Sequence, residues 1–262
     1  MRLSLLSPLD SLIAPPPEAR RVEFLARQPF AHRGLHGGGI VENSRAAFSG
    51  AAALGHGIEL DVQAARDGEA FVFHDATLDR LTNKSGDFAN FSGAELDHIT
   101  LAGTAENIPR LAEILTLVGG RVPILIEVKA PGPLVGVLCL SVRRALEGYR
   151  GDIAVMSFNP AVGRWFRHHA PRYVRGLVIT EQGESGWLGA FKGRAKRHLS
   201  LWQARPDFLA YDIRDLPSTF AARQRARGLK ILTWTVRTGE QEQVAFAHAD
   251  EVIYEKPQPE AE

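Results

Sequence analysis

The 262-residue chain has one cysteine, Cys139, which excludes an intramolecular disulfide framework and fits a reducing compartment. Cys139 lies in the apolar run 134–140, so we expect it to pack as a small buried hydrophobe. An excess of one charge is also missing. Lys and Arg number 31 and Asp and Glu number 30, and the net charge of +1 gives no support for a nucleic-acid-binding protein.

Long apolar runs are absent too. In the first 28 residues, Pro8, Asp10 and the prolines at 15–17 interrupt the apolar segments. The segments are therefore too short for a signal-peptide core or a membrane span. We therefore expect a soluble, cytoplasmic protein without a transmembrane segment. Residues 1–28 are predicted to be a lead-in that docks on a single domain spanning 29–262. This length, with a hydrophobic content of 45%, fits one α/β barrel of about 250 residues.

Eight short strands are predicted, and helical patterns separate most of them. They span 29–33, 57–62, 123–129, 153–158, 173–179, 207–213, 229–236 and 250–254. Strands separated by helices favour parallel βαβ units, so the predicted fold is an α/β (β/α)8 TIM barrel. A small hairpin after the second strand is an insertion in it. Polar residues gather at the carboxyl ends of the strands, the face that carries the active site in such barrels.

The second strand carries two carboxylates on one face. Glu59 and Asp61 are two residues apart in the alternating segment 57–62, so their side chains point the same way. Neighbouring carboxylates repel each other and need a cation or an exposed surface. Asp67-Gly68 is a strong signal for a two-residue hairpin turn. The pairing expected from that turn is Arg66 with Glu69, Gln63 with Val72, and Asp61 with His74.

A third carboxylate, Glu127, ends the strand at 123–129. Glu59, Asp61 and Glu127 together suit one hard divalent cation such as Mg²⁺ or Ca²⁺. Taken without Glu127, the pair Glu59 and Asp61 fits a solvated strand face as well as it fits a cation site. The third carboxylate makes a cation site the better interpretation.

Four further side chains at strand ends complete a set for phosphoryl transfer. His32 and His74 can exchange protons near neutral pH, one as a base and one as an acid. Arg33 can hold a phosphate oxygen with its planar fork, and Lys129 adds a point charge. The other histidines do not lie at predicted strand ends beside charged residues. They are predicted to be surface or packing residues: His36, His56, His98, His168, His169, His198 and His248.

A longer pattern runs through residues 31–257. It consists of Ala31-His32-Arg33-Gly34, Glu42-Asn43-Ser44, Ala47-Phe48, Glu59 with Asp61-Val62, Asp67-Gly68, His74-Asp75, Leu78 with Arg80 and Thr82, Ile108-Pro109, Glu127 with Lys129, and Trp234-Thr235-Val236. In this pattern the chain resembles the glycerophosphodiester phosphodiesterases. The resemblance implies a (β/α)8 barrel, one divalent cation, and hydrolysis of glycerophosphodiesters to glycerol 3-phosphate and an alcohol. It also suggests that the glycerol 2-OH attacks first and gives a cyclic phosphate.

The resemblance implies roles for the same residues. Glu59, Asp61 and Glu127 match the metal ligands, and His32 and His74 match the catalytic histidines. The positions that match phosphate contacts are Arg33 and Lys129.

The chain departs from the family pattern at three places. Arg237 stands for the usual Asn after Trp-Thr-Val, the closing segment is changed at 249–257, and Arg110 replaces a common Thr. We expect none of these departures to touch the metal or the histidines. They are expected to alter the rim of the pocket and hence the leaving alcohol.

Several residues have two interpretations. Asn43 either caps the helix that follows it or makes a polar contact to substrate, and Trp234 either packs in the barrel or forms a wall for the glycerol group. Glycines 37–39 lack the Lys-Ser/Thr of a P-loop, so a mobile loop is favoured over a phosphate cradle. A basic cluster is predicted to be a solvated helix face, with weak attraction to phospholipid surfaces as the second reading; it comprises Arg194, Lys196, Arg197 and His198.

The predicted function is therefore a metal-dependent phosphodiesterase acting on a small glycerophosphodiester. A lysophospholipase D-type enzyme is the near alternative, and it requires an apolar groove beside the same site. A non-catalytic barrel that binds phosphate esters is the alternative from another class. Nothing in the sequence indicates the oligomeric state.

Overall fold

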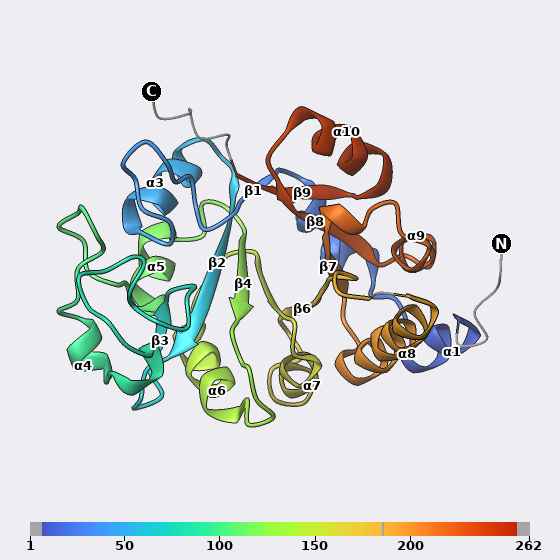
Figure 1. The fold of residues 1–262 in the computed structure, drawn as a ribbon, viewed down its shortest axis with the longest axis horizontal. Helices are drawn as coiled ribbons and strands as arrows, with labels where there is room; N and C mark the ends of the chain where they lie inside the picture. The colour runs from blue at the N-terminus through green and yellow to red at the C-terminus, as the bar shows by residue number, and fades with distance from the viewer. Residues whose placement is uncertain (1–6, 185, 256–262) are drawn as a thin grey trace.

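The computed structural model describes residues 7–184 and 186–255. A closed barrel of parallel strands lies at the centre, with helices around it (Figure 1). Its strands are β1 (Phe30–Ala31), β2 (Gly57–Ala64), β4 (Ile124–Val128), β5 (Ile153–Ser157), β6 (Val174–Ile179), β7 (Phe208–Asp212), β8 (Lys230–Val236) and β9 (Glu251–Tyr254). Strand β1 pairs with both β2 and β9, which closes the barrel. The predicted (β/α)8 fold is confirmed.

Helices connect successive strands and cover the outside of the barrel. They are α1 (Ser7–Ile13), α2 (Ala19–Val22), α3 (Arg45–Ala53), α4 (Gly93–Leu96), α5 (Leu111–Val118), α6 (Gly136–Ala145), α7 (Pro160–His169), α8 (Gly186–Ala204), α9 (Thr219–Ala226) and α10 (Gly239–His248), with single 3₁₀ turns at Glu23–Ala26, Phe88–Asn90 and Ile213–Asp215. No helix in these described ranges is both long and apolar enough to cross a membrane.

Apolar side chains fill the interior of the barrel. Phe30, Phe208 and Leu232 are fully buried there. Phe208 needs the space left by Gly176 on β6, since a Cβ at Gly176 would come within 2.4 Å of the Phe208 ring. Phe24 and Leu25 of the lead-in belong to the same cluster. The described part of the lead-in thus packs against the barrel core.

The lead-in is also tied to the outside of the barrel through one buried carboxylate. Asp10 of α1 is fully buried and accepts hydrogen bonds from His198 and Trp202 of α8 and from Gln224 of α9, at 2.7–2.9 Å. Burial acts to raise the pKa of Asp10, but these hydrogen bonds outweigh burial and the pKa is lowered. His198 is therefore a packing residue, as predicted. It and Arg197 are both buried, so the predicted solvated face is wrong for these two residues.

Replacing Asp10 by Ala should lower the free energy of unfolding by about 3 kcal/mol, because three buried donors lose their acceptor. The full difference in the free energy of unfolding should be seen at pH 6. The difference should shrink as the pH falls below 3.8, the ordinary pKa of an Asp carboxyl, since the wild-type carboxylate is then being protonated. Urea unfolding at several pH values measures this. Leu12→Ala on the same helix is the control because Leu12 is 79% exposed, and equal losses in both variants would contradict the role of Asp10.

The hairpin insertion is present, but its register differs from the prediction by one residue. Strand β3 (Ala70–Val72) pairs with β2 so that Val62 lies opposite Val72 and Gln63 opposite Phe71. The turn contains three residues, 66–68, because the amide of Ala65 bonds the carbonyl of Glu69 and Gly68 has a positive φ of 87°. Asp61 therefore faces Phe73, not His74.

Two helix boundaries differ from what the sequence pattern predicts. The pattern of 109–118 predicts a helix with Pro109 at its first position, but α5 begins at Leu111 with Arg110 as its N-cap, so Pro109 precedes the helix. The glycines at 183, 186, 189 and 193 predict a loop, yet those at 186, 189 and 193 belong to α8. Gly193 lies against the carboxyl group of Glu184, which would have to move to make room for a larger residue at 193. Cys139 is fully buried with a pKa raised to about 12 by burial, as its apolar surroundings predicted.

Candidate active site

Three buried carboxylates meet on the neighbouring strands β2 and β4. Asp61 and Glu127 are register partners on the two neighbouring strands, and Glu59 lies two residues before Asp61 on β2. One oxygen from each lies within 4.8 Å of the others. The strand periodicity that placed Glu59 and Asp61 on one face is thus realised, and the barrel brings Glu127 beside them.

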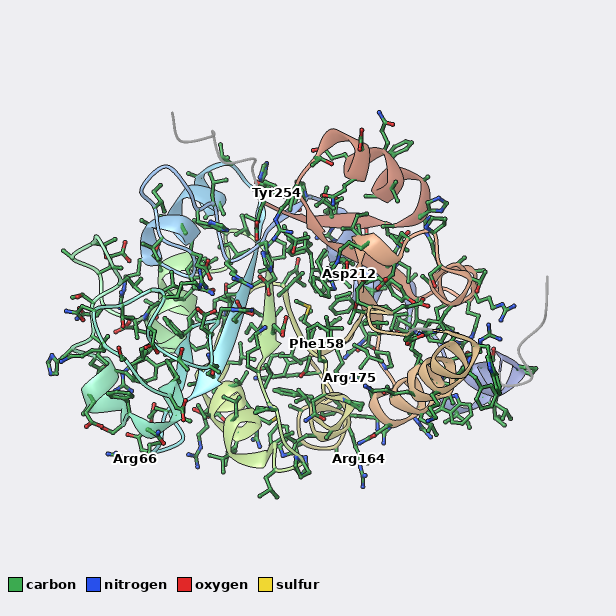
Figure 2. All side chains as sticks on the ribbon, viewed as in Figure 1. Arg66, Phe158, Arg164, Arg175, Asp212 and Tyr254 are labelled. Atoms are coloured by element: carbon green, nitrogen blue, oxygen red, sulfur yellow. The ribbon has the colours of Figure 1, made fainter. Side chains whose placement is uncertain are left out.

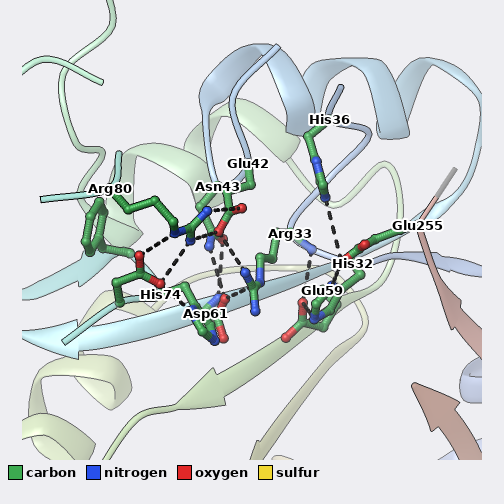
Figure 3. Close-up of polar contacts among 12 residues, drawn as sticks. His32, Arg33, His36, Glu42, Asn43, Glu59, Asp61, His74, Arg80 and Glu255 are labelled. Atoms are coloured by element: carbon green, nitrogen blue, oxygen red, sulfur yellow. Dashed lines mark hydrogen bonds and ion pairs between the residues drawn. The ribbon is translucent and has the colours of Figure 1, made fainter. Parts of the chain in front are cut away.

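Two cations lie against these carboxylates. The Nζ of Lys129 is 3.0 Å from Asp61 and 2.7 Å from Glu127. The Nε of Arg33 is 3.2 Å from Asp61, and its Nη1 donates to Glu42 at 2.7 Å (Figure 3). Arg33 has a φ of 56°, which is uncommon for a residue with a side chain and is typical of functional sites.

The three carboxyl groups differ in pKa. Burial, together with repulsion from Asp61 and Glu127, raises the pKa of Glu59 well above its ordinary value. Burial also raises the pKa of Glu127. For Asp61 burial acts in the same direction, but the attraction of Lys129 and Arg33 outweighs it and lowers the pKa. Two carboxyl groups that resist ionisation beside a third carboxylate mark a site short of positive charge.

The donor set fits a hard divalent cation. All three side chains offer carboxylate oxygens, which Mg²⁺ and Ca²⁺ prefer. The Oε1 of Glu59 is buried and has no hydrogen-bond partner among the described residues, while its Oε2 accepts from the backbone amide of Arg33 at 3.0 Å. A buried carboxylate oxygen without a donor is costly unless a cation binds it.

His32 follows β1 and is held by a carboxylate from the far end of the chain. Its Nδ1 lies 2.5 Å from Glu255 Oε1, and its Nε2 lies 3.9 Å from Glu59 (Figure 3). Arg237 in turn donates from Nε to Glu255 Oε2 at 2.7 Å. The departures at Arg237 and in the closing segment were expected not to touch the histidines. That prediction is wrong, because Glu255 contacts His32 directly and Arg237 holds Glu255.

His74 has a matching arrangement on the other side of the carboxylates. Its Nδ1 lies 2.7 Å from Asp75, and Arg80 donates to Asp75 at 2.6 and 2.9 Å. Arg80 also donates to Glu42, which links it to Arg33. Hydrogen bonds from Arg80 and then from His74 lower the pKa of Asp75 to about 2, although burial opposes them. Each histidine thus has an ionised carboxylate at Nδ1, which leaves Nε2 available.

Both histidines favour the neutral form in this structure. Burial lowers the pKa of His32, and Glu255 offsets this only in part. Burial also lowers the pKa of His74, and nearby Arg33 and Lys129 act in the same direction. A neutral imidazole whose Nδ1–H is held by a carboxylate presents Nε2 as a proton acceptor.

These side chains surround a cavity of about 380 Å³ at the carboxyl face of the barrel. Its lining includes His32, Arg33, His74, Glu127, Lys129, Phe158, Asp212, Arg214, Trp234 and Arg237; Figure 2 labels Phe158 and Asp212 among all side chains. Trp234 donates from Nε1 to the carbonyl of Ala210 at 3.0 Å, and its ring meets Phe158 edge-to-face. Trp234 packs against the barrel core and also lines the cavity, and its role as a wall for the glycerol group stays a prediction.

A second, more open groove of about 680 Å³ adjoins the cavity. His74, Glu127, Lys129 and Phe158 line both. The rest of the groove is largely apolar, with Ala130, Pro131, Pro133, Pro160 and Ala161. His74 therefore lies where the charged cavity opens into a groove whose remaining lining is uncharged.

Asn43 does not cap α3. Ser44 is the N-cap and accepts from the amide of Ala47, while Asn43 is buried and donates from Nδ2 to Asp61 Oδ2 at 3.0 Å. The cap interpretation is wrong, and the observed contact orients one of the carboxylates. His36, predicted to be a surface or packing residue, lies 4.0 Å from Glu255 at the edge of the site.

Sequence reasoning missed the carboxylates behind the two histidines. Asp75 was adjacent to His74 and part of the matched pattern, and its neighbour Arg80 was matched as well, so a signal existed. Glu255 had a weaker signal, since it lies in the altered closing segment and 223 residues separate it from His32. Only closure of the barrel between β1 and β9 brings the two together.

Comparison with known proteins identifies the family. The family model for the glycerophosphoryl diester phosphodiesterase family matches residues 32–258. A search of curated proteins gives no match.

Solved structures share the fold. The chain is similar to an Oleispira antarctica phosphodiesterase in complex with the product sn-glycerol-3-phosphate, with a TM-score of 0.73, 21% identity, and coverage of 88% of this chain and 93% of that one. It is similar to a glycerophosphodiester phosphodiesterase from Thermotoga maritima (TM-score 0.66, 23% identity, coverage 87% and 94%). A third is the Agrobacterium tumefaciens enzyme of that name (TM-score 0.62, 25% identity, coverage 88% and 96%).

The family match covers the barrel strands from β2 to β9, the three carboxylates, both histidines and Trp234. The barrel, the acidic cluster at its carboxyl face and this match agree with one another, and we conclude that the chain belongs to the glycerophosphoryl diester phosphodiesterase family of hydrolases.

Proposed function

We propose that the protein hydrolyses glycerophosphodiesters to glycerol 3-phosphate and an alcohol, with one divalent cation and two histidines. The observation that carries the proposal is the grouping around one cavity of three buried carboxylates and two carboxylate-held imidazoles. A phosphodiester is anionic and a poor electrophile. Its hydrolysis needs charge neutralised, an oxygen nucleophile deprotonated and the leaving oxygen protonated.

The cation would be held by Glu59, Asp61 and Glu127. Bound there, it would withdraw charge from the phosphoryl group and favour deprotonation of the attacking hydroxyl. Asn43 and the backbone amide of Arg33 hold two of these carboxylates in place. Mg²⁺ and Ca²⁺ both fit the donor set.

Arg33 and Lys129 would bind the phosphoryl oxygens. Both line the cavity and both are held by carboxylates on one side. Their pKa values are raised, because the attraction of Asp61 and the other carboxylates outweighs burial, so both stay charged. Two fixed cations on the reacting group lower the cost of the charge that develops on it.

His32 would act as the base and His74 as the acid. His32 is the more deeply buried and faces Glu59, while His74 borders the groove through which an alcohol can leave. An anionic phosphodiester between Arg33 and Lys129 would offset their repulsion of an imidazolium. We therefore expect the pKa of His74 to rise when substrate binds.

Metal-dependent turnover tests the function. With Mg²⁺ or Ca²⁺ the protein should release glycerol 3-phosphate from glycerophosphodiesters, and a chelator should abolish the release. Phosphate-ester binding without turnover would favour the non-catalytic barrel instead. The lysophospholipase D-type alternative is supported by the apolar groove beside His74, and a preference for lysophospholipids over deacylated diesters would identify it.

Glu255 is proposed to position His32. Glu255→Gln should lower kcat by at least about tenfold, since a carboxylate that fixes the tautomer of a catalytic imidazole is worth up to ~10⁴-fold. Glu255 acts to raise the pKa of His32, so its loss lowers that pKa further and moves the acid limb of kcat/KM to lower pH. Glu255→Asp should keep most activity. A pH profile of Glu255→Gln identical to the wild type would contradict the role.

A further inference from the structure

Two aromatic side chains project from the start of α8 into solvent. Trp187 is 83% exposed and Phe191, one helical turn later, is 67% exposed. Residues i and i+4 lie on the same helix face, so the two rings stand side by side. Lys192 and Arg194 are exposed around them. We call Trp187, Phe191, Lys192 and Arg194 the α8 rim.

The α8 rim lies on the catalytic side of the barrel. Helix α8 begins seven residues after β6 ends, and the carboxyl ends of the strands form the face that holds the cavity. Other exposed apolar residues also follow strand ends: Leu134 and Val137 follow β4, and Phe158 follows β5 and lines the groove. Helix α7 packs against both α6 and α8, so these side chains belong to neighbouring units of the barrel (Figure 1).

The charge of α8 has one sign. The helix contains Lys192, Arg194, Lys196 and Arg197 and no acidic residue. Arg197 is buried and paired with Glu181 and Glu184. The other three are exposed, and none forms an ion pair with a described residue. Helices that lie in the interface of anionic membranes typically combine Trp and Phe with unpaired Lys and Arg.

We propose that the α8 rim docks the protein on an anionic phospholipid surface, with the catalytic cavity facing the lipid. A protein partner is less favoured, because the centres of protein interfaces are depleted in Lys. A second copy is less favoured too, since a twofold contact would place the basic residues of one rim against those of the other. The docking does not depend on the proposed function. Its consequence, uptake of a lipid-borne diester through the groove, does.

Vesicle co-sedimentation of the full chain tests the docking. The protein should bind vesicles of phosphatidylcholine mixed with phosphatidylglycerol more tightly than pure phosphatidylcholine, and added salt should weaken the binding. Trp187→Ala with Phe191→Ala should lower the vesicle partition coefficient at least about tenfold. Lys192→Gln with Arg194→Gln should lower it about fivefold per residue on the anionic vesicles only.

Phe246→Ala is the matched control, because Phe246 is 92% exposed on α10. It should bind vesicles like the wild type. Equal binding by the wild type and the Trp187/Phe191 variant, or no binding to either vesicle, would overturn the proposal. So would a wild-type dimer that becomes a monomer in the Trp187/Phe191 variant, since the rim would then join two copies. Turnover of a water-soluble diester should be unchanged in this variant, and this readout alone rests on the proposed function.

Discussion

His74→Ala should lower kcat for an alkyl glycerophosphodiester by about 10²–10⁴-fold, the usual contribution of a positioned general acid. An alkoxide is a poor leaving group unless it is protonated as the bond to phosphorus breaks. His74 is the imidazole that borders both the cavity and the adjoining groove, so it is placed to give that proton. Asp75 and Arg80 hold the ring from behind and are not expected to replace it.

The leaving group decides whether the role is that of an acid. A nitrophenyl diester needs little protonation, so His74→Ala should lose far less activity on it than on the alkyl diester. His32→Ala should be impaired on both substrates, since a base is needed in either case. His98→Ala serves as the control because His98 is exposed and outside the cavity. Near-native turnover of the alkyl diester by His74→Ala would remove His74 from the mechanism.

Glu127→Gln should bind Mg²⁺ or Ca²⁺ at least about 100-fold more weakly than the wild type. Loss of a residue that merely supports a metal ligand costs about 10–100-fold, and Glu127 would be a ligand itself. Isothermal titration measures the affinity without reference to catalysis. Glu147→Gln is the control, since Glu147 is 59% exposed and pairs only with Arg143 among the described residues. Unchanged affinity in Glu127→Gln would contradict the three-ligand site.

Thermal unfolding tests the same cation site independently of the binding titration. Without a cation, burial and repulsion raise the pKa of Glu127, so its ionised form destabilises the folded state near neutral pH. Metal-free Glu127→Gln should therefore have a Tm at or above that of the metal-free wild type. Added cation should raise the Tm of the wild type much more than that of the variant, because only tight binding to the folded state shifts the equilibrium.

The barrel and its acidic cluster could be predicted because their signals are local. Each strand was a short apolar run, and all eight predicted strands lie within two residues of the observed bounds at each end. The i, i+2 spacing of Glu59 and Asp61 fixed their common face, and strand-end placement brought Glu127 into the same set. Periodicity needs no knowledge of the rest of the fold.

The hairpin and α8 show where local signals fail. Asp67-Gly68 correctly marked a turn, but Gly68 serves a three-residue turn, and the single extra residue shifts every pair in the register. His74 still reaches the cavity because β3 ends at Val72 and the amide of Phe73 makes the last backbone bond to β2 before the chain leaves the sheet. In α8 the glycines suggested a loop. Packing of the helix against α7 and α1 outweighs their weak helix propensity.

By itself the sequence determined the (β/α)8 fold, the family, and the residues that form the acidic cluster, since these follow from patterns a few residues long. Only the tertiary structure decided what supports them. Glu255 reaches His32 across 223 residues because β9 closes the barrel beside β1. Asn43 orients Asp61 instead of capping a helix, and Asp10 holds the lead-in to α8 and α9. Such contacts join segments distant in the chain, and no local pattern encodes which distant segments meet.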